Sequence, residues 1–504
     1  MNDPHVDFHD AGRRSLPRPR FRSQGVHDAL AAPSTLALPS TLALPSTLAL
    51  PSTLTLPSTL TLPSTLALLA TLALLAAVAA PRAVLAQSAE ITLPSVAKDR
   101  GVRSGDFTLH PSFGLQGHHD TNIFNGSEKE AGNQPKGATS LRFLPKLSLQ
   151  NEPTGNVTFQ FSSAGDARLY LDDDLGLQEL NGLGGTAGLD VTFGARKSLS
   201  FSLFDYFSRQ LRANNWDTLE ALDRNTNDVG ARVEFHPGDI PERRPFKVAL
   251  MGSYAIDRFD DFKMGDTSTV NTRLTGSWRF LPKTAAIVDG SWSFRNYDSQ
   301  TLISRGLAAD SQPFRAKGGL AGALTKRVSF ELLGGWGMSL HEGGTSDANN
   351  TVSTYLANAS IGLRPSDSTR FLLQYTHDFR DSFYGNFVNF HHGALGLRQR
   401  IGQIMDVKAN FGVSFGTYGT VDQSTSNTSK DKVNAAVVST RKDTSLDGNL
   451  TAAFDISRLV GMDIGYQFRS LITTFKVFAS DKKTVLDDGA YTAHELFATL
   501  TVRY

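Results

Sequence analysis

The sequence predicts an all-β protein, a transmembrane antiparallel up-and-down β-barrel of about 18 strands, within a range of about 16–18. Three observations carry this prediction. Segments of about ten to fifteen residues alternate apolar and polar side chains. Short turns alternate with long polar loops between these segments. The chain also ends on an aromatic residue, Tyr504, which follows apolar residues at every second position.

The composition excludes several classes of function. The chain has 504 residues and no cysteine, so disulfide frameworks, thiolate metal sites and cysteine nucleophiles are ruled out. The charges of its 50 basic and 49 acidic residues nearly cancel. The chain as a whole therefore lacks the net positive charge that would attract nucleic acid. The mean hydropathy of −0.21 suits a barrel in which only alternate residues face lipid, and it equally suits a soluble all-β protein.

The N-terminal region is predicted to be an export signal rather than part of the fold. Residues 33–68 repeat the unit PSTLAL or PSTLTL, whose regular prolines prevent a continuous helix. An uncharged apolar run, Leu66–Ala80, follows the repeat, and small or apolar residues predict a signal-peptidase cleavage site between Ala86 and Gln87. The alternative is an anchoring helix, which needs roughly 20 apolar residues, whereas about 15 are present.

These boundaries divide the chain into three parts. Residues 1–86 are predicted to be the signal peptide with its low-complexity repeat, residues 87–105 a short periplasmic segment, and residues 106–504 the barrel. We expect the segment 87–105 to be too short for the plug domain of a gated active transporter.

The barrel region shows the period of two that β-strands require. In the segment TRLTGSWRF, Leu274, Trp278 and Phe280 alternate with Arg273 and Arg279. The predicted strands lie near 106–116, 138–150, 156–171, 186–194, 198–211, 226–236, 245–258, 268–280, 284–298, 313–324, 327–341, 352–364, 369–383, 388–400, 405–419, 445–455, 460–475 and 491–504.

The connections are predicted to alternate between tight turns and longer polar loops. Tight turns fall at 152–155, 194–197, 281–283, 325–327, 365–368, 402 and 457–458, with 237–244 as a long exception. Loops fall at 117–136, 172–186, 213–225, 259–267, 299–312, 342–351, 420–444 and 476–490, with 384–387 as a short exception. An even number of strands places both termini on the turn side, which is periplasmic in outer-membrane barrels.

Strand length and the polar face favour a membrane barrel over a soluble β protein. Strands of soluble proteins average about five or six residues, and these are roughly twice as long, as a tilted crossing of a bilayer requires. A sheet in lipid must close, because lipid offers no partner for an open edge. One face carries charged residues on strand after strand, as a wet lumen would. A propeller would instead show a repeat of about 40–50 residues, and none is present.

The last segment matches the assembly signal of outer-membrane barrels. Its apolar residues alternate with polar ones, and the chain stops on the aromatic residue itself. This pattern is similar to the C-terminal signal that the barrel assembly machinery reads, in which Phe is the usual last residue and Tyr a known variant. The predicted signal residues are Leu496, Ala498, Leu500, Val502 and Tyr504.

The start of the barrel resembles a known family. The segment FTLHPSFGLQGHHDTNIF (107–124) is similar to the opening strand of the beta-barrel porin 2 family, in which Leu-x-Pro-Ser leads into Asp-x-Asn-Ile. The segment FDYFSRQLRANN (204–215) resembles that family's passage from strand to loop. The resemblance covers roughly residues 100–504 and implies an outer-membrane barrel, with some relatives linked to exopolysaccharide export. The residues that match the motif are Leu109, Pro111, Ser112, Asp120, Asn122 and Ile123.

Charged residues on the polar face are the candidate functional site. One interpretation is a pore lining that orders water and selects solutes by charge and hydrogen bonding; the other is a set of ion pairs that braces the wall. The mixture of signs argues against strong selectivity for cations or anions. The predicted lumen residues are Lys247, Asp257, Arg273, Arg279, Asp289, Arg295, Glu331, Asp406, Lys408, Asp463 and Arg469.

Other chemistry finds little support. His391 and His392 are adjacent on a strand and should point to opposite faces, so they cannot share one ion. The acidic run 172–174 in a predicted loop could bind a divalent cation or bridge to lipopolysaccharide, and plain solvation is the simpler interpretation. No nucleophile motif such as G-x-S-x-G is present. We therefore predict no enzyme activity, no catalytic or metal residues and no cofactor.

Three hypotheses for function follow. The first is a porin-like channel for polar solutes in the outer membrane of a Gram-negative bacterium. The second is an export barrel for a secreted polysaccharide that works with periplasmic partners, which aromatic residues stacked along the lumen would favour. The third is a structural or adhesive barrel with a closed lumen. The expected partners are outer-membrane lipid, the barrel assembly machinery and, under the second hypothesis, polysaccharide-export components.

Overall fold

The computed structural model describes residues 101–127, 134–151, 155–214, 221–237, 245–260, 262–298, 309–342, 351–382, 386–419, 441–474, 477–478, 485–487 and 489–504. The predicted signal peptide, including Ala86 and Gln87, lies outside the described residues, and so does most of the predicted loop 420–444. Within the described part, no helix is both long and apolar enough to cross a membrane.

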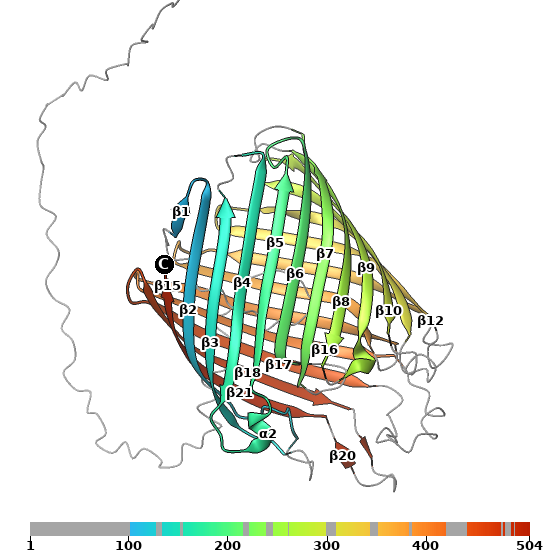
Figure 1. Cartoon of the computed structure of the whole chain (residues 1–504). Coiled ribbons are helices and arrows are strands. Elements are labelled where there is room, and N and C mark those ends of the chain that lie inside the picture. Colours follow the sequence, from blue (N-terminus) through green and yellow to red (C-terminus); the bar gives the residue numbers. More distant parts are fainter. Residues whose placement is uncertain are drawn as a thin grey trace, which may run out of the picture. The chain divides into compact units, whose positions relative to one another are not determined.

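The described strands form a closed antiparallel barrel (Figure 1). The main sheet contains 19 strands, of which β1 is a short addition and the other 18 make the wall. Each wall strand pairs with its neighbour in sequence, and β21 pairs with both β18 and β2. The wall strands are β2 (Phe107–Asp120), β3 (Ala138–Asn151), β4 (Val157–Tyr170), β5 (Gly182–Phe193), β6 (Leu199–Asn214), β7 (Ala221–Phe235), β8 (Phe246–Phe259), β9 (Thr267–Leu281), β10 (Thr284–Tyr297), β11 (Asp310–Ala323), β12 (Val328–Glu342), β13 (Thr351–Leu363), β14 (Thr369–Ser382), β15 (Asn386–Ile401), β16 (Met405–Tyr418), β17 (Lys442–Asp455), β18 (Val460–Thr473) and β21 (Tyr491–Arg503).

This architecture confirms the predicted fold class, and each predicted strand corresponds to one wall strand. Several boundaries differ at the loop end of the barrel, which we define as the end with the longer connections. The first predicted strand stops at residue 116, whereas β2 continues to Asp120. The residues that extend it are Gly117, His118, His119 and Asp120. They break the apolar pattern, because the outward face there no longer carries an apolar side chain at every second position.

Five small elements were not predicted. The strand β1 (Val102–Ser104) pairs with the first residues of β2, so part of the segment 87–105 belongs to the sheet rather than standing apart from it. The helix α2 (Leu175–Gln178), the 3₁₀ helix η2 (Lys263–Gly265) and the two-stranded sheet of β19 (Val477–Phe478) and β20 (Val485–Asp487) all lie in connections at the loop end. Such short elements carry too few residues to show a period.

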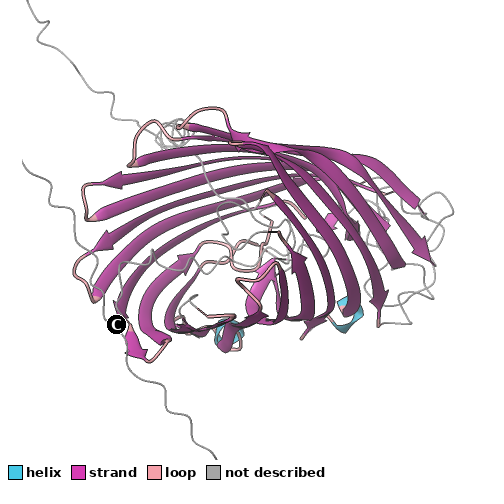
Figure 2. Ribbon diagram, turned by 90° about the horizontal axis from the view of Figure 1, so that it is seen from above, coloured by secondary structure: helices cyan, strands magenta, loops and turns pink. Residues whose placement is uncertain are grey.

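Contacts between strands that are not neighbours identify the lumen face. Lys317 Nζ on β11 donates to Asn358 Oδ1 on β13 at 3.1 Å, across β12. Arg469 on β18 lies 3.2 Å from Asp120 on β2, across β21. Side chains on the convex side of a curved wall diverge, so such contacts form only on the concave side. Figure 2 shows the strands following one another around a common axis.

The opposite face is apolar and exposed. Leu250, Trp278 and Val288 are 56%, 56% and 58% exposed, respectively, and they belong to three neighbouring strands. A soluble barrel would bury such side chains in its interior, whereas here the interior face carries the charges. The described residues therefore show the distribution of polarity that a lipid-facing wall requires.

Candidate functional site

The structure places the predicted lumen residues on the concave face and joins most of them in ion pairs with residues of other strands. Within the described ranges, Glu331, Lys408 and Asp463 make no ion pair, and Arg279 lies near the turn end of β9. The pairs are Lys247–Glu234 at 2.7 Å, Arg224–Asp257 at 2.5 Å, Arg273–Asp289 at 2.9 Å, Arg295–Asp381 at 3.5 Å, Arg398–Asp406, and Arg469–Glu495 at 2.6 Å.

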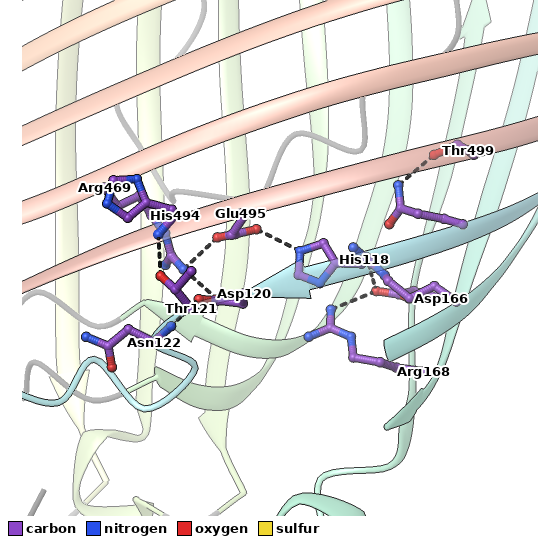
Figure 3. Close-up of polar contacts among 12 residues, drawn as sticks. His118, Asp120, Thr121, Asn122, Asp166, Arg168, Arg469, His494, Glu495 and Thr499 are labelled. Carbon is purple, nitrogen blue, oxygen red and sulfur yellow. Dashed lines mark hydrogen bonds and ion pairs between the residues drawn. The ribbon is translucent and has the colours of Figure 1, made fainter. Parts of the chain in front are cut away.

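One polar network lies where the first and last wall strands pair and close the barrel (Figure 3). Arg469 on β18 contacts both Asp120 on β2, at 3.2 Å, and Glu495 on β21, at 2.6 Å. Glu495 also lies 3.0 Å from His118 on β2. The two carboxylates would repel each other without the guanidinium between them, so Arg469 stabilises the closing pair of strands. The sequence analysis identified Arg469 but not its acidic partners.

The same network continues along the closing strands. Gln116 Nε2 donates to Thr499 Oγ1 at 2.7 Å, and both side chains are buried. On the neighbouring strands, Arg142 donates two hydrogen bonds to Asp166, and Arg168 lies 3.1 Å from the same carboxylate. These contacts pair most of the polar groups on this part of the lumen face, although Gln116 Oε1 and Arg168 Nε are buried without a hydrogen-bond partner among the described residues.

The wall separates between β13 and β14 at the loop end. The two strands pair only from Ala357 opposite His377 to Leu363 opposite Phe371, although β13 begins at Thr351 and β14 continues to Ser382. Beyond His377, β14 remains paired with β15. The free part of β14 and its partner on β15 (378–382 and 386–390) form what we call the inner hairpin.

The inner hairpin lies against the lumen face of the preceding strands. Phe379 is 1% exposed and packs with Val352 and Leu356 of β13 and with Phe387. A Cβ atom at Gly337 of β12 would lie 2.6 Å from the Phe379 ring, so glycine at this position makes room for the ring. This end of β14 therefore occupies part of the barrel's cross-section.

Polar contacts fasten the inner hairpin to β10, β11 and β12. Asp381 accepts a hydrogen bond from Ser311 of β11 at 2.8 Å, and it lies 3.3 Å from His341 of β12 and 3.5 Å from Arg295 of β10. Ser311 and His341 are both buried beneath the hairpin. The predicted lumen residue Arg295 thus contacts an element that bends into the lumen, which sequence reasoning did not foresee.

A second arginine reinforces this attachment. Arg315 Nε on β11 donates to Asp378 at 2.9 Å, and another of its nitrogens donates to the carbonyl oxygen of Phe379 at 2.6 Å. The guanidinium also lies 4.3 Å from the centroid of the Phe379 ring. Arg315 thus pairs with a carboxylate and also satisfies a backbone carbonyl oxygen of the hairpin. These contacts fix the described part of the hairpin in place.

Histidines fill the point at which the strands separate. His377 stacks on His391 with ring centroids 4.2 Å apart, and its Nε2 lies 3.1 Å from Thr354 Oγ1 of β13. His391 lies 2.9 Å from the hydroxyl of Tyr375, whereas His392 contacts Ser414 at 2.7 Å on the other face. His391 and His392 therefore point to opposite faces, as expected from their adjacency.

The Asp-x-Asn-Ile motif organises the first loop. The side chain of Asp120 accepts from the backbone nitrogen of Asn122 at 2.8 Å. Asn122 is fully buried, and its amide donates to the carbonyl oxygens of Gly126, at 2.8 Å, and Thr492, at 3.0 Å. Ile123 packs against buried side chains that include Leu177 of α2. The motif thus joins the first loop to the last strand.

The acidic run 172–174 has structural partners. Asp174 caps the N-terminus of α2 and lies 2.5 Å from Lys136, and the hydrogen bond from this ammonium lowers the pKa of the Asp174 carboxyl. Asp172 accepts from the backbone nitrogen of Thr139 at 2.8 Å. The part of the chain that the structure describes contains no group of three or more residues with a metal-ligating arrangement.

Comparison with solved structures finds distant similarity. The chain is similar to the outer membrane protein OpdK from Pseudomonas aeruginosa, with a TM-score of 0.42, 11% identity and coverage of 79% of this chain and 99% of that one. For OccAB3 from Acinetobacter baumannii the TM-score is 0.41 with 12% identity and coverage of 79% and 99%. For the FrpB iron transporter from Neisseria meningitidis it is 0.40 with 8% identity and coverage of 80% and 82%. No family model and no curated protein matches the chain, so the resemblance to the beta-barrel porin 2 family stays a prediction.

Proposed function

We propose that this protein is an outer-membrane channel for polar solutes whose lumen is narrowed by the inner hairpin. One observation carries the proposal: charges of both signs cover the lumen face on most strands, while a segment of the wall bends inward and is fastened there by Asp381 and Arg315. A barrel of about 18 strands is wide enough for an aqueous path, and a charged inner face keeps such a path wet. The proposal involves no catalysis.

The exposed apolar face supports the membrane location. Its large side chains would be costly in water, and they cover the wall strands rather than one local patch. Tyr504 and the first residues of β2 lie at the same end of the barrel, because the Tyr504 nitrogen donates to the Pro111 carbonyl oxygen at 3.1 Å. Under this proposal that end is periplasmic, and the barrel assembly machinery inserts the chain.

Single-channel recording from the refolded protein in a planar bilayer tests this function. We expect discrete conductance steps, smaller than an unobstructed barrel of this size would give, because the inner hairpin occupies part of the lumen. A membrane that contains verified folded barrel and shows no conductance would contradict the channel and favour the closed structural alternative.

A second candidate function rests on one aromatic pair. Phe204 and Tyr206 on β6 stack with centroids 5.5 Å apart, and Tyr206 is 48% exposed on the same face as Asp190 and Arg232, which interact across β6. An exposed ring on the lumen face is a platform on which a sugar could stack, which favours polysaccharide export as the second candidate. Loss of surface polysaccharide on deletion of the gene would favour export over general solute passage.

A further inference from the structure

A row of basic side chains crosses the turn end of four neighbouring strands. Arg370 on β14 lies opposite Arg398 on β15, and Arg398 lies opposite Lys408 on β16. Arg364 directly follows β13, at the level where the register of β13 and β14 leads to Arg370. We call Arg364, Arg370, Arg398 and Lys408 the basic row.

The basic row faces the lumen. Arg398 contacts Asp406, which lies on the concave face with the other predicted lumen residues. The alternate residues on these strands are apolar and point outward: Leu373 is 53% exposed and Ile401 is 50% exposed. Any ligand of this row is therefore a solute inside the barrel rather than a lipid headgroup outside it.

The charges of the row are only partly balanced by the protein, because Asp406 interacts electrostatically with Arg370 as well as with Arg398, and Asp463 interacts with Lys408. Asp406 accepts from Arg398 Nε and lies 3.9 Å from Arg400. Among the residues that the structure describes, Arg364, Arg370 and Lys408 make no hydrogen bond or ion pair through their side chains. Like charges placed directly opposite each other on neighbouring strands destabilise a sheet. Elsewhere on the lumen face, arginines generally have acidic partners.

A small cavity adjoins the row. It has a volume of about 90 Å³, and it is lined by Ser368, Asp367, Arg370, Arg398 and Arg400. Three arginines thus line one space together with a serine and a single acidic residue. Guanidinium groups present a planar fork of donors that matches carboxylate and phosphate oxygens.

We propose that the basic row binds small oxyanions, carboxylates or phosphates, as they pass the turn end of the lumen. This inference rests on the proposed channel and specifies its solute class. The anion supplies the hydrogen-bonding acidic partner that Arg364 and Arg370 lack, which accounts for a row of like charges that the fold compensates only in part. Local charge of one sign at a mouth also raises the concentration of counter-ions there, even when the whole lumen has mixed charge.

Ion selectivity gives the first test. In a planar bilayer with a potassium chloride gradient, the reversal potential of the wild type should show preference for chloride over potassium. The double variant Arg364→Gln with Arg370→Gln should lose most of that preference. A matched control, Arg196→Gln with Lys197→Gln, removes the same charge from an exposed turn at the same end and should retain it. An equal loss in both variants would overturn the proposal.

Direct binding gives a second test that needs no open lumen. Inorganic phosphate and succinate are titrated calorimetrically into the refolded protein in detergent, which excludes lipid as a ligand source. The double variant should bind both anions about ten-fold more weakly, since a charge-assisted hydrogen bond is lost. Wild-type affinity in the double variant would refute the site, whereas binding without any conductance would refute the channel and keep the site. Removing unpaired like charges should leave the thermal midpoint unchanged or higher, which verifies folding.

Discussion

At the scale of single residues, the lumen face divides into groups that hold the protein together and groups that face water without a partner. Arg469, Glu495 and Asp120 belong to the first kind, because each lies within hydrogen-bonding distance of an opposite charge. Arg364 and Arg370 belong to the second. Removing one member of a buried pair leaves an uncompensated charge, whereas removing an unpaired charge relieves repulsion. Structural and functional charges can therefore be separated by the sign of their effect on stability.

Asn122 should prove the most sensitive position of the first loop. The substitution Asn122→Ala removes an amide that is fully buried and makes three hydrogen bonds, two to Gly126 and one to Thr492. We expect it to lower the free energy of local opening by about 2 kcal/mol. Hydrogen exchange of the Gly126 amide measures this.

The control for this substitution is Asn156→Ala. Asn156 is exposed in a tight turn, and its side chain makes no hydrogen bond with the described residues. Exchange at Gly126 should be unchanged in the control. Equal protection in the Asn122 variant and the wild type would contradict the role assigned to the motif.

At the scale of elements, the main departure from a regular barrel is the separation of β14 from β13. Paired strands normally continue together to the loop, and here the pairing stops after His377 while β14 and β15 stay paired. The separation costs backbone hydrogen bonds on the edge of β13. Burial of Phe379 and the contacts of Asp381 and Arg315 offset that cost. The inner hairpin is thus held in a defined position against the lumen face and is not a frayed strand end.

The substitution Phe379→Ala should loosen the inner hairpin. It removes the ring that packs on Val352 and Leu356. Truncating a buried Phe to Ala in a core lowers the free energy of unfolding by roughly 3–5 kcal/mol. We expect larger or noisier single-channel conductance from a barrel that still folds. Phe415→Ala is the matched control, because that ring is 52% exposed on the outer face. A conductance identical to the wild type would show that the hairpin does not limit the pore.

At the scale of the whole molecule, one pair of strands converts a sheet into a barrel. The last strand, β21, pairs with β2 from Ser112 opposite Arg503 to Asp120 opposite Glu495. The first residues of β2 extend beyond the end of β21, and β1 covers that remainder. The edge that lipid could not satisfy is thereby paired along most of its length.

The substitution Tyr504→Ala should impair assembly without altering the finished fold. The side chain is 63% exposed and contributes little packing, whereas its backbone nitrogen bonds to Pro111 in either case. We expect a several-fold smaller amount of assembled barrel in cells, measured by heat-modifiable migration in gels, and normal refolding in detergent. Tyr254→Ala, at an outward position that is 44% exposed on β8, should assemble normally. Equal amounts of both variants would contradict the assembly signal.

Local periodicity determined most of this protein's fold from sequence alone. Alternation of apolar and polar side chains located each wall strand, and the even strand number implied that β21 closes on β2, because a period of two reports directly which face a residue occupies. The same rule placed Arg273, Asp289 and Arg469 on the charged face. Strand ends were less accurate where the outward face ceases to be apolar, as at His118 and Asp120.

Only the tertiary structure decided which charges have partners and where the wall bends. The contact between Arg295 and Asp381 joins β10 to β14, and nothing in either strand's own pattern records a neighbour so distant in sequence. The inner hairpin keeps the alternation of an ordinary strand, since the face of β14 that would meet the outside instead meets the lumen wall through Phe379. Periodicity reports the face of a strand but not what that face touches. The inward position of the inner hairpin and the partly unpaired basic row therefore appear only once all the strands are placed together.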